Sequence, residues 1–430
     1  MTLASSLVTQ SSQATKTVAA KHEEPWKVLD RLLPFLNSSC RLWWDEMAPV
    51  IGRSMLRTGY SIESQYKYLL LVQSTLIPFL GPFPNQGRSN ITWPSCIAGD
   101  KGPLDISVNY QGNSKPTFRI TIEPIGPYAG TDTDLMNEIA PRQLLHQLSH
   151  IQPGVDLTWY DQLEKVITIR NHEARQKQDA LAHYSTKTQT LIGLDFHEGS
   201  FTVKAYFFPH LRASVTGEDW ARILFDGIRT VCNTDAFNRE LTKIEQYIGS
   251  IRHKVLAEKP NVAFDCKDPA KSRIKVYAAV DMSSLDDVYD FWTIGGHLHG
   301  PHIENGFEIV RKMWNMIYTK SLPNGKPRES MTVHCNWELS ISDPTPAPKA
   351  YFLVADDTDQ HVSSAITNLF RDLGWDEHAK THNMLEKEAY PAFDMKTSTD
   401  VYTWLSFAHS KKTGPYITVY TKPLGGTDEL

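Results

Sequence analysis

The sequence lacks the features that mark several large classes of protein. Its most apolar run, Tyr68 to Leu80, is broken by Gln73 and Pro78, and it falls short of the roughly 18 uninterrupted apolar residues that a membrane-spanning helix needs. The five cysteines are scattered and include no Cys-x-x-Cys pair, which excludes a disulfide framework and a zinc ribbon and favours a reducing, cytoplasmic setting. The formal net charge of −5 argues against a protein that coats nucleic acid or an anionic membrane.

What the sequence does contain is enough apolar and aromatic material for a large folded body. Its 430 residues are 41% hydrophobic and include 11 Trp, 17 Tyr and 17 Phe, which is more aromatic surface than a simple core requires. Residues 1–22 are rich in Ser, Thr, Gln and Ala and lack the basic start and apolar centre of a secretory signal. We therefore expect a disordered arm at 1–22, a single domain at 23–423 and a polar tail at 424–430.

Hydrophobic periodicity predicts helices and hairpins that alternate along the chain. Residues 25–80 carry apolar positions at helical spacing, which indicates three helices. Alternating residues at 104–110 and 118–123 then predict two strands, joined by the turn-forming residues Gln111 to Ser114. The same order recurs four times, with helices expected near 132–150 and 157–179, 217–230 and 236–252, 284–298 and 302–319, and 360–373 and 377–388, and with strands expected near 188–196 and 201–208, 261–266 and 272–280, 330–341 and 349–354, and 401–408 and 415–422.

Five repeated units of two helices and a hairpin favour one closed assembly over a string of separate domains. Because hairpins join antiparallel strands, closing five of them on themselves gives a ten-stranded antiparallel β-barrel surrounded by helices, an α+β fold. A barrel this wide is not filled by its own side chains, so the sequence predicts a ligand-sized chamber in the lumen. A closed barrel also leaves no free strand edge that demands a partner, which is compatible with a monomer or a homodimer.

Cationic and phenolic side chains occupy alternate positions on five of the predicted strands. In Arg273-Ile274-Lys275-Val276-Tyr277 the charged and phenolic residues lie on one face and the apolar residues on the other. A single face of this kind is often only a solvated edge of a sheet. Its recurrence favours convergence on the lumen instead, and the residues concerned are Arg119, Lys204, Tyr206, Arg273, Lys275, Tyr277, Lys349, Tyr351, Tyr416 and Tyr420.

In a partly dry chamber these side chains suit one kind of ligand. Arg and Lys form charge-assisted hydrogen bonds to a diphosphate, and the face of a Tyr ring stabilises a nearby cation by roughly 0.5 to 2 kcal/mol. A diphosphate beside a carbocation is an allylic diphosphate that ionises. A binding module that sequesters a diphosphate without chemistry is the alternative from another class, but it gives no reason for the five tyrosines.

These residues also resemble a known family. From Trp26 to Pro423 the chain is similar to the fungal indole prenyltransferases of the dimethylallyltryptophan synthase type. The similar segments, whose order and spacing make the resemblance specific, are Leu80-Gly81-Pro82-Phe83-Pro84, Pro103 to Ser107, Arg119 to Gly126 with Gly130-Thr131, Lys204 to Tyr206 followed by Pro209, Arg273 to Tyr277, and Tyr416 to Tyr420. The resemblance implies a prenyltransferase barrel and metal-independent transfer of a dimethylallyl group from dimethylallyl diphosphate to an indole, in fungal indole alkaloid biosynthesis, a branch of secondary metabolism.

The resemblance also implies a role for each residue that matches. The diphosphate would be held by Arg119, Lys204, Arg273, Lys275 and Lys349, the last at a position where relatives often have Gln, and the carbocation would be shielded by Tyr206, Tyr277, Tyr351, Tyr416 and Tyr420. Asp105 stands where relatives usually carry Glu, and the carboxylate would accept the indole N–H and assist attack; the alternative is an ordinary strand-end aspartate. Leu191 stands where relatives that alkylate free tryptophan at carbon 4 have a proton-accepting Lys. That departure favours a tryptophan-containing cyclic dipeptide over free tryptophan or another indole.

Two motifs suggest a metal ion, and each has a simpler interpretation. Asp286-Asp287-Val288-Tyr289-Asp290 matches the Asp-rich pattern of magnesium-dependent prenyl synthases, but Ser284 with Asp287 reads as a helix-capping pair. His297, His299 and His302 lack the further ligands of a zinc site. We therefore expect no metal cofactor, and the expected partners are the donor diphosphate and the indole substrate alone.

Overall fold

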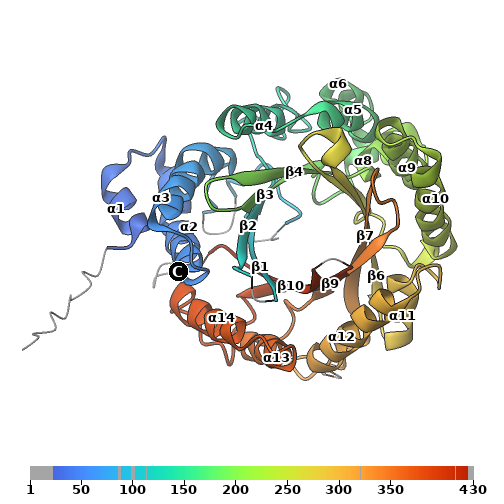
Figure 1. Cartoon of the computed structure of the whole chain (residues 1–430). Coiled ribbons are helices and arrows are strands. Elements are labelled where there is room, and N and C mark those ends of the chain that lie inside the picture. The colour runs from blue at the N-terminus through green and yellow to red at the C-terminus, as the bar shows by residue number, and fades with distance from the viewer. Residues whose placement is uncertain are drawn as a thin grey trace, which may run out of the picture.

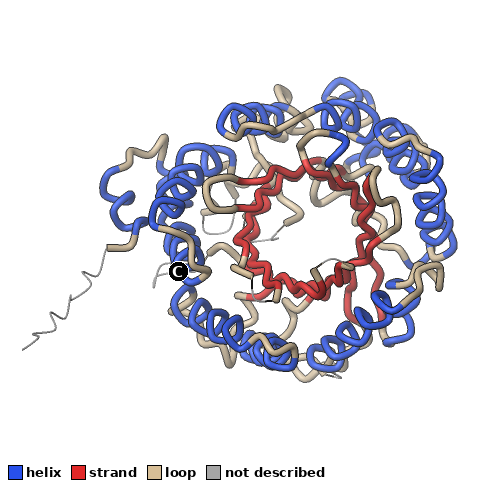
Figure 2. The backbone as a smooth tube through the Cα atoms, in the orientation of Figure 1, coloured by secondary structure: helices blue, strands red, loops and turns tan. Residues whose placement is uncertain are grey.

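Ten strands form a closed antiparallel barrel, and the helices lie around it as an outer layer (Figures 1 and 2). This computed structural model describes residues 23–85, 89–97, 102–112, 114–319, 321–411 and 413–424. The arm predicted at 1–22, residues 425–430 of the predicted tail and Asn113 of the first predicted turn lie outside the described residues.

The barrel consists of five hairpins, as the sequence predicts. Its strands are β1 (Leu104–Gln111), β2 (Thr117–Ile122), β3 (Thr190–Phe196), β4 (Phe201–Phe207), β5 (Asn261–Asp265), β6 (Arg273–Met282), β7 (Met331–Ser340), β8 (Ala347–Leu353), β9 (Tyr402–Ser410) and β10 (Gly414–Thr421). Each strand pairs with its neighbours in sequence, and β1 also pairs with β10, from Ile106 with Thr421 to Gln111 with Tyr416. That pairing closes the ring, and the predicted fold class is confirmed.

The surrounding helices differ in number from the predicted two per unit. They are α1 (Pro25–Leu32), α2 (Ser38–Arg57), α3 (Ile62–Leu71), α4 (Ile139–Ile151), α5 (Thr158–Ile167), α6 (Asn171–Gln176), α7 (Gln178–Leu181), α8 (His210–Thr216), α9 (Trp220–Val231), α10 (Asp235–Ser250), α11 (Leu285–Trp292), α12 (Pro301–Ile317), α13 (Asp359–Asp372) and α14 (Asp376–Ala389). The helix predicted at 157–179 is three helices, because Glu173 accepts the backbone N–H of Arg170 at 2.7 Å and so starts a new helix there. Among the described residues, none of these helices combines the length and apolar character that crossing a bilayer requires.

The main apolar core lies between the outer face of the barrel and the helices. On β2, Phe118, Ile120 and Ile122 are fully buried, whereas Arg119 and Thr121 between them retain some exposure toward the lumen. Each large apolar side chain buried in this way contributes about 1.5 to 3 kcal/mol to folding. The period-two pattern of the strands therefore separates a dry outer face from a polar inner one.

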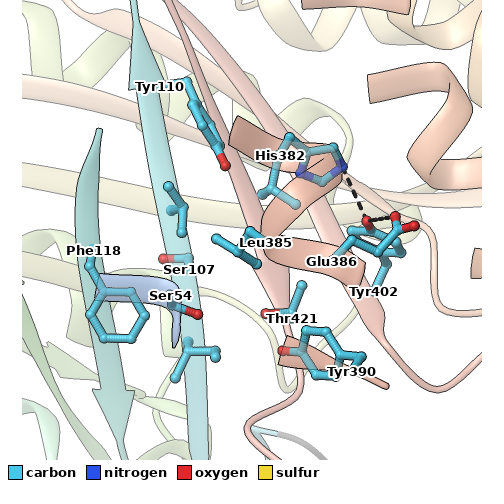
Figure 3. A pocket seen from close by; sticks show the side chains of 13 residues that line it. Ser54, Ser107, Tyr110, Phe118, His382, Leu385, Glu386, Tyr390, Tyr402 and Thr421 are labelled. Atoms are coloured by element: carbon cyan, nitrogen blue, oxygen red, sulfur yellow. Dashed lines mark hydrogen bonds between the residues drawn. The ribbon is translucent and has the colours of Figure 1, made fainter. Parts of the chain in front are cut away.

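A small polar cluster lies outside the barrel, where α14 packs against β9 (Figure 3). The Tyr402 hydroxyl donates to Glu386 Oε2 at 2.6 Å and lies 3.1 Å from His382 Nε2. The cavity beside these groups has a volume of about 10 Å³, which is the size of a single water molecule. We therefore assign this cluster to stability and not to ligand binding.

We expect Tyr402→Phe to lower the free energy of unfolding by about 1 to 3 kcal/mol, because it leaves the half-buried Glu386 and the buried His382 without the hydroxyl. The function of the folded protein should not change. Chemical denaturation measures the effect, and Tyr289→Phe is the matched control, since Tyr289 donates to Glu304 on the exposed surface. Equal losses of stability in the two variants would contradict this assignment.

Candidate active site

The inward-facing side chains line two cavities in the barrel, and every residue predicted for the site lines one of them. The cation cavity has a volume of about 400 Å³, and its predicted residues are Arg119, Lys204, Arg273, Lys275, Lys349 and Tyr416. The aromatic cavity has a volume of about 210 Å³, and its predicted residues are Asp105, Leu191, Tyr206, Tyr277, Tyr351 and Tyr420. The strand pattern predicted that ten of these twelve side chains face inward, and the family resemblance added Asp105 and Leu191. In the structure, most of the charged residues line one cavity and most of the aromatic residues line the other.

Three buried or half-buried carboxylates hold the cations in place, and sequence reasoning missed them. Asp195 lies between Arg119, at 3.3 Å, and the Lys204 ammonium, with which it forms a close ion pair. These two cations outweigh burial and hold the pKa of Asp195 well below its usual range. The residue stands directly opposite Arg119 in the pairing of β2 with β3, so only the strand register could have revealed it.

The second half of the cation cavity repeats this arrangement on β5, β6 and β7. Arg273 Nε lies 2.8 Å from Asp265 Oδ2, and its Nη1 lies 3.2 Å from Glu338 Oε1. Lys275 Nζ lies 3.4 Å from the other Glu338 oxygen. Each carboxylate therefore contacts two cations, because Asp265 also pairs with Lys267 at 3.0 Å. The ion pairs therefore hold the arginine and lysine side chains in fixed orientations before an anion binds.

Lys349 differs from the other cations because its nearest described partners are neutral. Its ammonium donates to Thr418 Oγ1 at 3.2 Å and lies 4.8 and 5.2 Å from the ring centroids of Tyr351 and Tyr416. Burial, together with the neighbouring cations, lowers the pKa of Lys349 well below its usual value, and burial lowers that of Lys204 to about 8. An anion in this cavity would favour the protonated form of both lysines.

Four tyrosines of the aromatic cavity form a layer beside the cation cavity, because three of them stand two residues after a lysine that lines the cation cavity. The ring centroids of Tyr206 and Tyr277, Tyr277 and Tyr351, and Tyr351 and Tyr420 lie 6.1, 6.0 and 6.0 Å apart. The Tyr277 and Tyr351 hydroxyls are 3.3 Å apart, and Asn336 Nδ2 donates to the latter at 2.9 Å. Burial raises the pKa of all four phenols, that of Tyr420 to about 12. The rings are therefore neutral, and the faces of neutral phenol rings are electron-rich.

Asp105 faces the aromatic cavity from β1. Its Oδ1 atom is buried and has no hydrogen-bond partner among the described residues. Burial raises the pKa of this carboxyl well above its usual value, and the backbone N–H of Ile106 opposes that shift only in part. A buried acceptor without a donor is costly in an empty site, and an indole N–H would supply the missing donor.

Other residues of the aromatic cavity were not found from the sequence. His210 follows β4 at the start of α8, and His334 on β7 packs against Trp404 with ring centroids 4.5 Å apart. His210 lies after the end of β4, so the alternation of strand residues could not identify it as inward-facing. Leu191, on the wall between β2 and β4, is buried and apolar as expected.

A buried glutamate anchors the segment that covers one side of this cavity. Glu123 accepts the indole N–H of Trp93 at 2.7 Å and the hydroxyl of Thr188 at 2.8 Å. The backbone N–H of Cys96 donates to the same Thr188 oxygen at 3.2 Å, and both Cys96 and Thr188 line the cavity. Burial raises the pKa of Glu123 to about 7.

The Asp-rich motif lies in the outer helical layer. Ser284 Oγ accepts the backbone N–H of Asp287 at 3.2 Å, which confirms the predicted helix cap. Asp290 accepts the Tyr247 hydroxyl at 2.7 Å. In the described part of the chain, no group of three or more His, Cys, Asp or Glu side chains is arranged to hold a metal ion.

A closed ten-stranded barrel with a cationic end, a tyrosine layer and an aromatic end defines the class of prenyltransferase barrels, and the solved structures agree. The crystal structure of AnaPT from Neosartorya fischeri superimposes with a TM-score of 0.86 at 27% identity, over 95% of this chain and 100% of that one. The complex of NotF with brevianamide F and DMSPP gives a TM-score of 0.83 at 25% identity, over 94% and 99%.

Sequence comparison gives the family. The sequence model described as tryptophan dimethylallyltransferase matches residues 39–384. Echinulin prenyltransferase 1 of Aspergillus ruber is 30% identical over 428 residues, which cover 94% of this chain and 100% of that protein. The chain therefore belongs to the tryptophan dimethylallyltransferase family, the fungal indole prenyltransferases, as its motifs predicted. It is an aromatic prenyltransferase and not a passive diphosphate-binding module.

Proposed function

We propose that this enzyme transfers a dimethylallyl group from dimethylallyl diphosphate to the indole of a tryptophan-containing cyclic dipeptide, as a step of fungal indole alkaloid biosynthesis. The observation that carries the proposal is that successive inward-facing positions of a strand line the two cavities, as Lys275 lines the cation cavity and Tyr277 the aromatic cavity. A diphosphate among the cations would place its allyl group against the tyrosine rings. An indole in the aromatic cavity would then face that allyl group from the opposite side.

The cation cavity supplies the groups that the leaving diphosphate needs. As the bond between the allyl carbon and oxygen breaks, negative charge grows on the diphosphate, and contacts from Arg119, Lys204, Arg273, Lys275 and Lys349 strengthen with it. The allyl cation that remains would lie against the tyrosine layer and be shielded by Tyr206, Tyr277, Tyr351, Tyr416 and Tyr420. Water reaching the cation would hydrolyse it, so the buried rings also protect the intermediate.

Asp105 would act as the residue that orients and activates the indole. Its unpartnered Oδ1 would accept the indole N–H, and this hydrogen bond strengthens as positive charge develops on the ring during attack. The carbon–carbon bond then forms with the allyl cation. Loss of a proton, or a ring closure, completes the reaction.

Two features support a cyclic dipeptide as the indole substrate. Leu191 places an apolar side chain in the aromatic cavity, which suits a bulky neutral molecule. NotF, which shares the fold over 94% of this chain, is solved with brevianamide F, a cyclic dipeptide. The test is incubation with dimethylallyl diphosphate and a panel that contains brevianamide F, other tryptophan cyclic dipeptides and free tryptophan. Mass detection of one added prenyl unit on free tryptophan alone would overturn the substrate class.

Free tryptophan is the second candidate, and a specific observation favours it. Glu258 and Lys259 are exposed residues that line the aromatic cavity, where they could pair with an ammonium and a carboxylate. A cyclic dipeptide carries neither charge. In the same panel, Lys259→Ala should therefore raise the KM for tryptophan if tryptophan is the substrate, and should leave the KM for a cyclic dipeptide unchanged.

We propose that transfer needs no metal ion, because the cations of the cavity neutralise the diphosphate in its place. Turnover should therefore persist in excess EDTA, measured as product formed per minute with and without the chelator. Added Mg²⁺ should not restore or create activity. A loss of turnover in EDTA that Mg²⁺ reverses would show that the protein's own cations are not sufficient.

We also propose a cytoplasmic location. All five cysteines are free thiols in the structure, which is the state that a reducing compartment maintains. Localisation of the tagged protein in fungal cells tests this proposal.

A further inference from the structure

His210 lines the aromatic cavity as a buried imidazole without a hydrogen bond to the part of the chain that the structure describes. It is only 7% exposed, yet neither of its ring nitrogens has a hydrogen-bond partner among the described residues. The ring lies between aromatic neighbours, with its centroid 5.2 Å from that of Tyr184 and 6.3 Å from that of Phe208. Leaving a buried polar group without a partner costs about 1 to 3 kcal/mol, and such groups call for an explanation.

The reaction proposed for this cavity requires a base when it ends by loss of a proton. When an aromatic carbon attacks the allyl cation, that carbon carries both its hydrogen and the new prenyl group, and the ring is positively charged. The hydrogen must leave as a proton for the ring to recover aromaticity. Leu191 provides no basic group on the adjoining wall, so the other side chains of the cavity are the candidates for a protein base.

Most of the other polar side chains of the aromatic cavity are poor candidates. The buried tyrosines are neutral phenols, whose oxygens are weak bases. Asp105 is the partner proposed for the indole N–H. Glu258 and Lys259 are exposed, and a lysine ammonium has no free electron pair.

Two imidazoles remain, and their positions differ. His334 pairs with Tyr351 in the register of β7 with β8, so it belongs to the tyrosine layer and contacts Trp404. His210 lies beyond the far end of β4, where the backbone N–H of Phe208 donates to Gln189 at 3.1 Å. It therefore follows Tyr206 of the tyrosine layer by four residues, just past the end of the strand that pairs with the Leu191 strand.

We propose that His210 is the catalytic base that takes the proton from the alkylated indole carbon, an inference that rests on the proposed function. The allyl carbon–oxygen bond breaks and its electron pair leaves with the diphosphate. An electron pair of the indole forms the new carbon–carbon bond. The proton on that carbon then moves to the free imidazole nitrogen, and the electron pair of the broken C–H bond restores the aromatic ring.

The protonation state of the imidazole agrees with this role. Burial, aided by the charge of Lys259, lowers the pKa of His210 to about 4. At neutral pH the ring is therefore neutral and has a free electron pair. A cationic alkylated indole is a far stronger acid than an imidazolium, so the transfer is downhill.

The test compares His210→Gln and His210→Ala with the wild type, using dimethylallyl diphosphate with brevianamide F and with tryptophan, each carrying a deuterated indole ring. We expect kcat to fall roughly 10-fold to 100-fold in both variants. Proton loss should become slow enough to show a primary deuterium isotope effect that the wild type lacks. Imidazole added to the His210→Ala enzyme should fill the vacated space and restore part of the rate. His378→Gln is the matched control, because His378 is equally buried but packs on Trp375 outside the barrel.

The outcomes separate this inference from the proposed function. If the wild type prenylates either indole and the kcat of His210→Gln is within about twofold of the wild-type kcat, the role of His210 is wrong but the proposed function stands. A lower rate with neither an isotope effect nor imidazole rescue would also overturn it, because a structural role predicts that result. A wild-type enzyme that prenylates neither indole would overturn both the proposed function and this inference.

Discussion

Arg273→Ala is expected to lower turnover by at least about tenfold while the enzyme stays folded, because contacts to a leaving group act where charge develops in the transition state. Retention of the fold follows from the ion pairs. Asp265 keeps Lys267 as a partner at 3.0 Å, and Glu338 keeps Lys275 at 3.4 Å, so no carboxylate is left buried and unpaired. Steady-state kinetics with dimethylallyl diphosphate measure the loss, and circular dichroism checks the fold.

The control for this variant is Lys267→Ala. Lys267 binds the same carboxylate as Arg273, but it is not among the residues that line the cation cavity. Its removal should leave kcat close to the wild-type value. Lys204→Ala extends the test to the other half of the cavity, since Asp195 keeps Arg119. Near-normal turnover in both Arg273→Ala and Lys204→Ala would show that these cations do not hold the donor.

The sequence was sufficient to predict the barrel and its inner face. Strand side chains alternate with a period of two, so Arg273, Lys275 and Tyr277 had to share one face, and apolar neighbours such as Ile274 marked the opposite one. Closure of five hairpins then brought that face into the lumen. These predictions require only the alternation of residues within each strand and the number of hairpins.

The missing parts of the site depend on long-range geometry. Asp195, Asp265 and Glu338 become informative only once the strand register places them opposite Arg119, Lys204 and Lys275. Only their positions in the folded barrel show that each carboxylate neutralises a cation on the neighbouring strand. The helix break at Arg170 was missed for a related reason, since a single capping contact outweighed a helical pattern that continued past it.

The two ends of the lumen differ in whether the protein itself supplies partners for their polar groups. At the cation end, the opposing carboxylates stabilise the ionised arginines and lysines other than Lys349 without a ligand. At the aromatic end, Asp105 Oδ1 and both nitrogens of His210 have no partner among the described residues. The ion pairs at the cation end therefore orient the cationic side chains before the donor binds. The unpartnered atoms at the aromatic end remain free to form hydrogen bonds with the substrate.

Asp105→Asn is expected to lower kcat/KM for the indole substrate roughly 10-fold to 100-fold, because asparagine keeps the shape but cannot carry the negative charge that stabilises the developing indole cation. The pH dependence gives a sharper test. Burial raises the pKa of Asp105 well above its usual value, so the carboxylate form is present above that raised pKa and is lost as the pH falls through it. Wild-type turnover should therefore decline on the acid side, at a pH above the usual aspartate range, and Asp105→Asn should lack that decline.

Asp281→Asn is the matched control for this change. Asp281 lies on β6, is exposed and accepts the Thr332 hydroxyl at 2.6 Å, so its substitution should alter neither kcat/KM nor the pH profile. If Asp105→Asn retains the wild-type rate and the same acid-side decline, the carboxylate is an ordinary strand aspartate and some other group of the cavity must bind the indole. A lower rate with an unchanged profile would instead mean that Asp105 positions the indole through its shape, because the titrating group would then still be present.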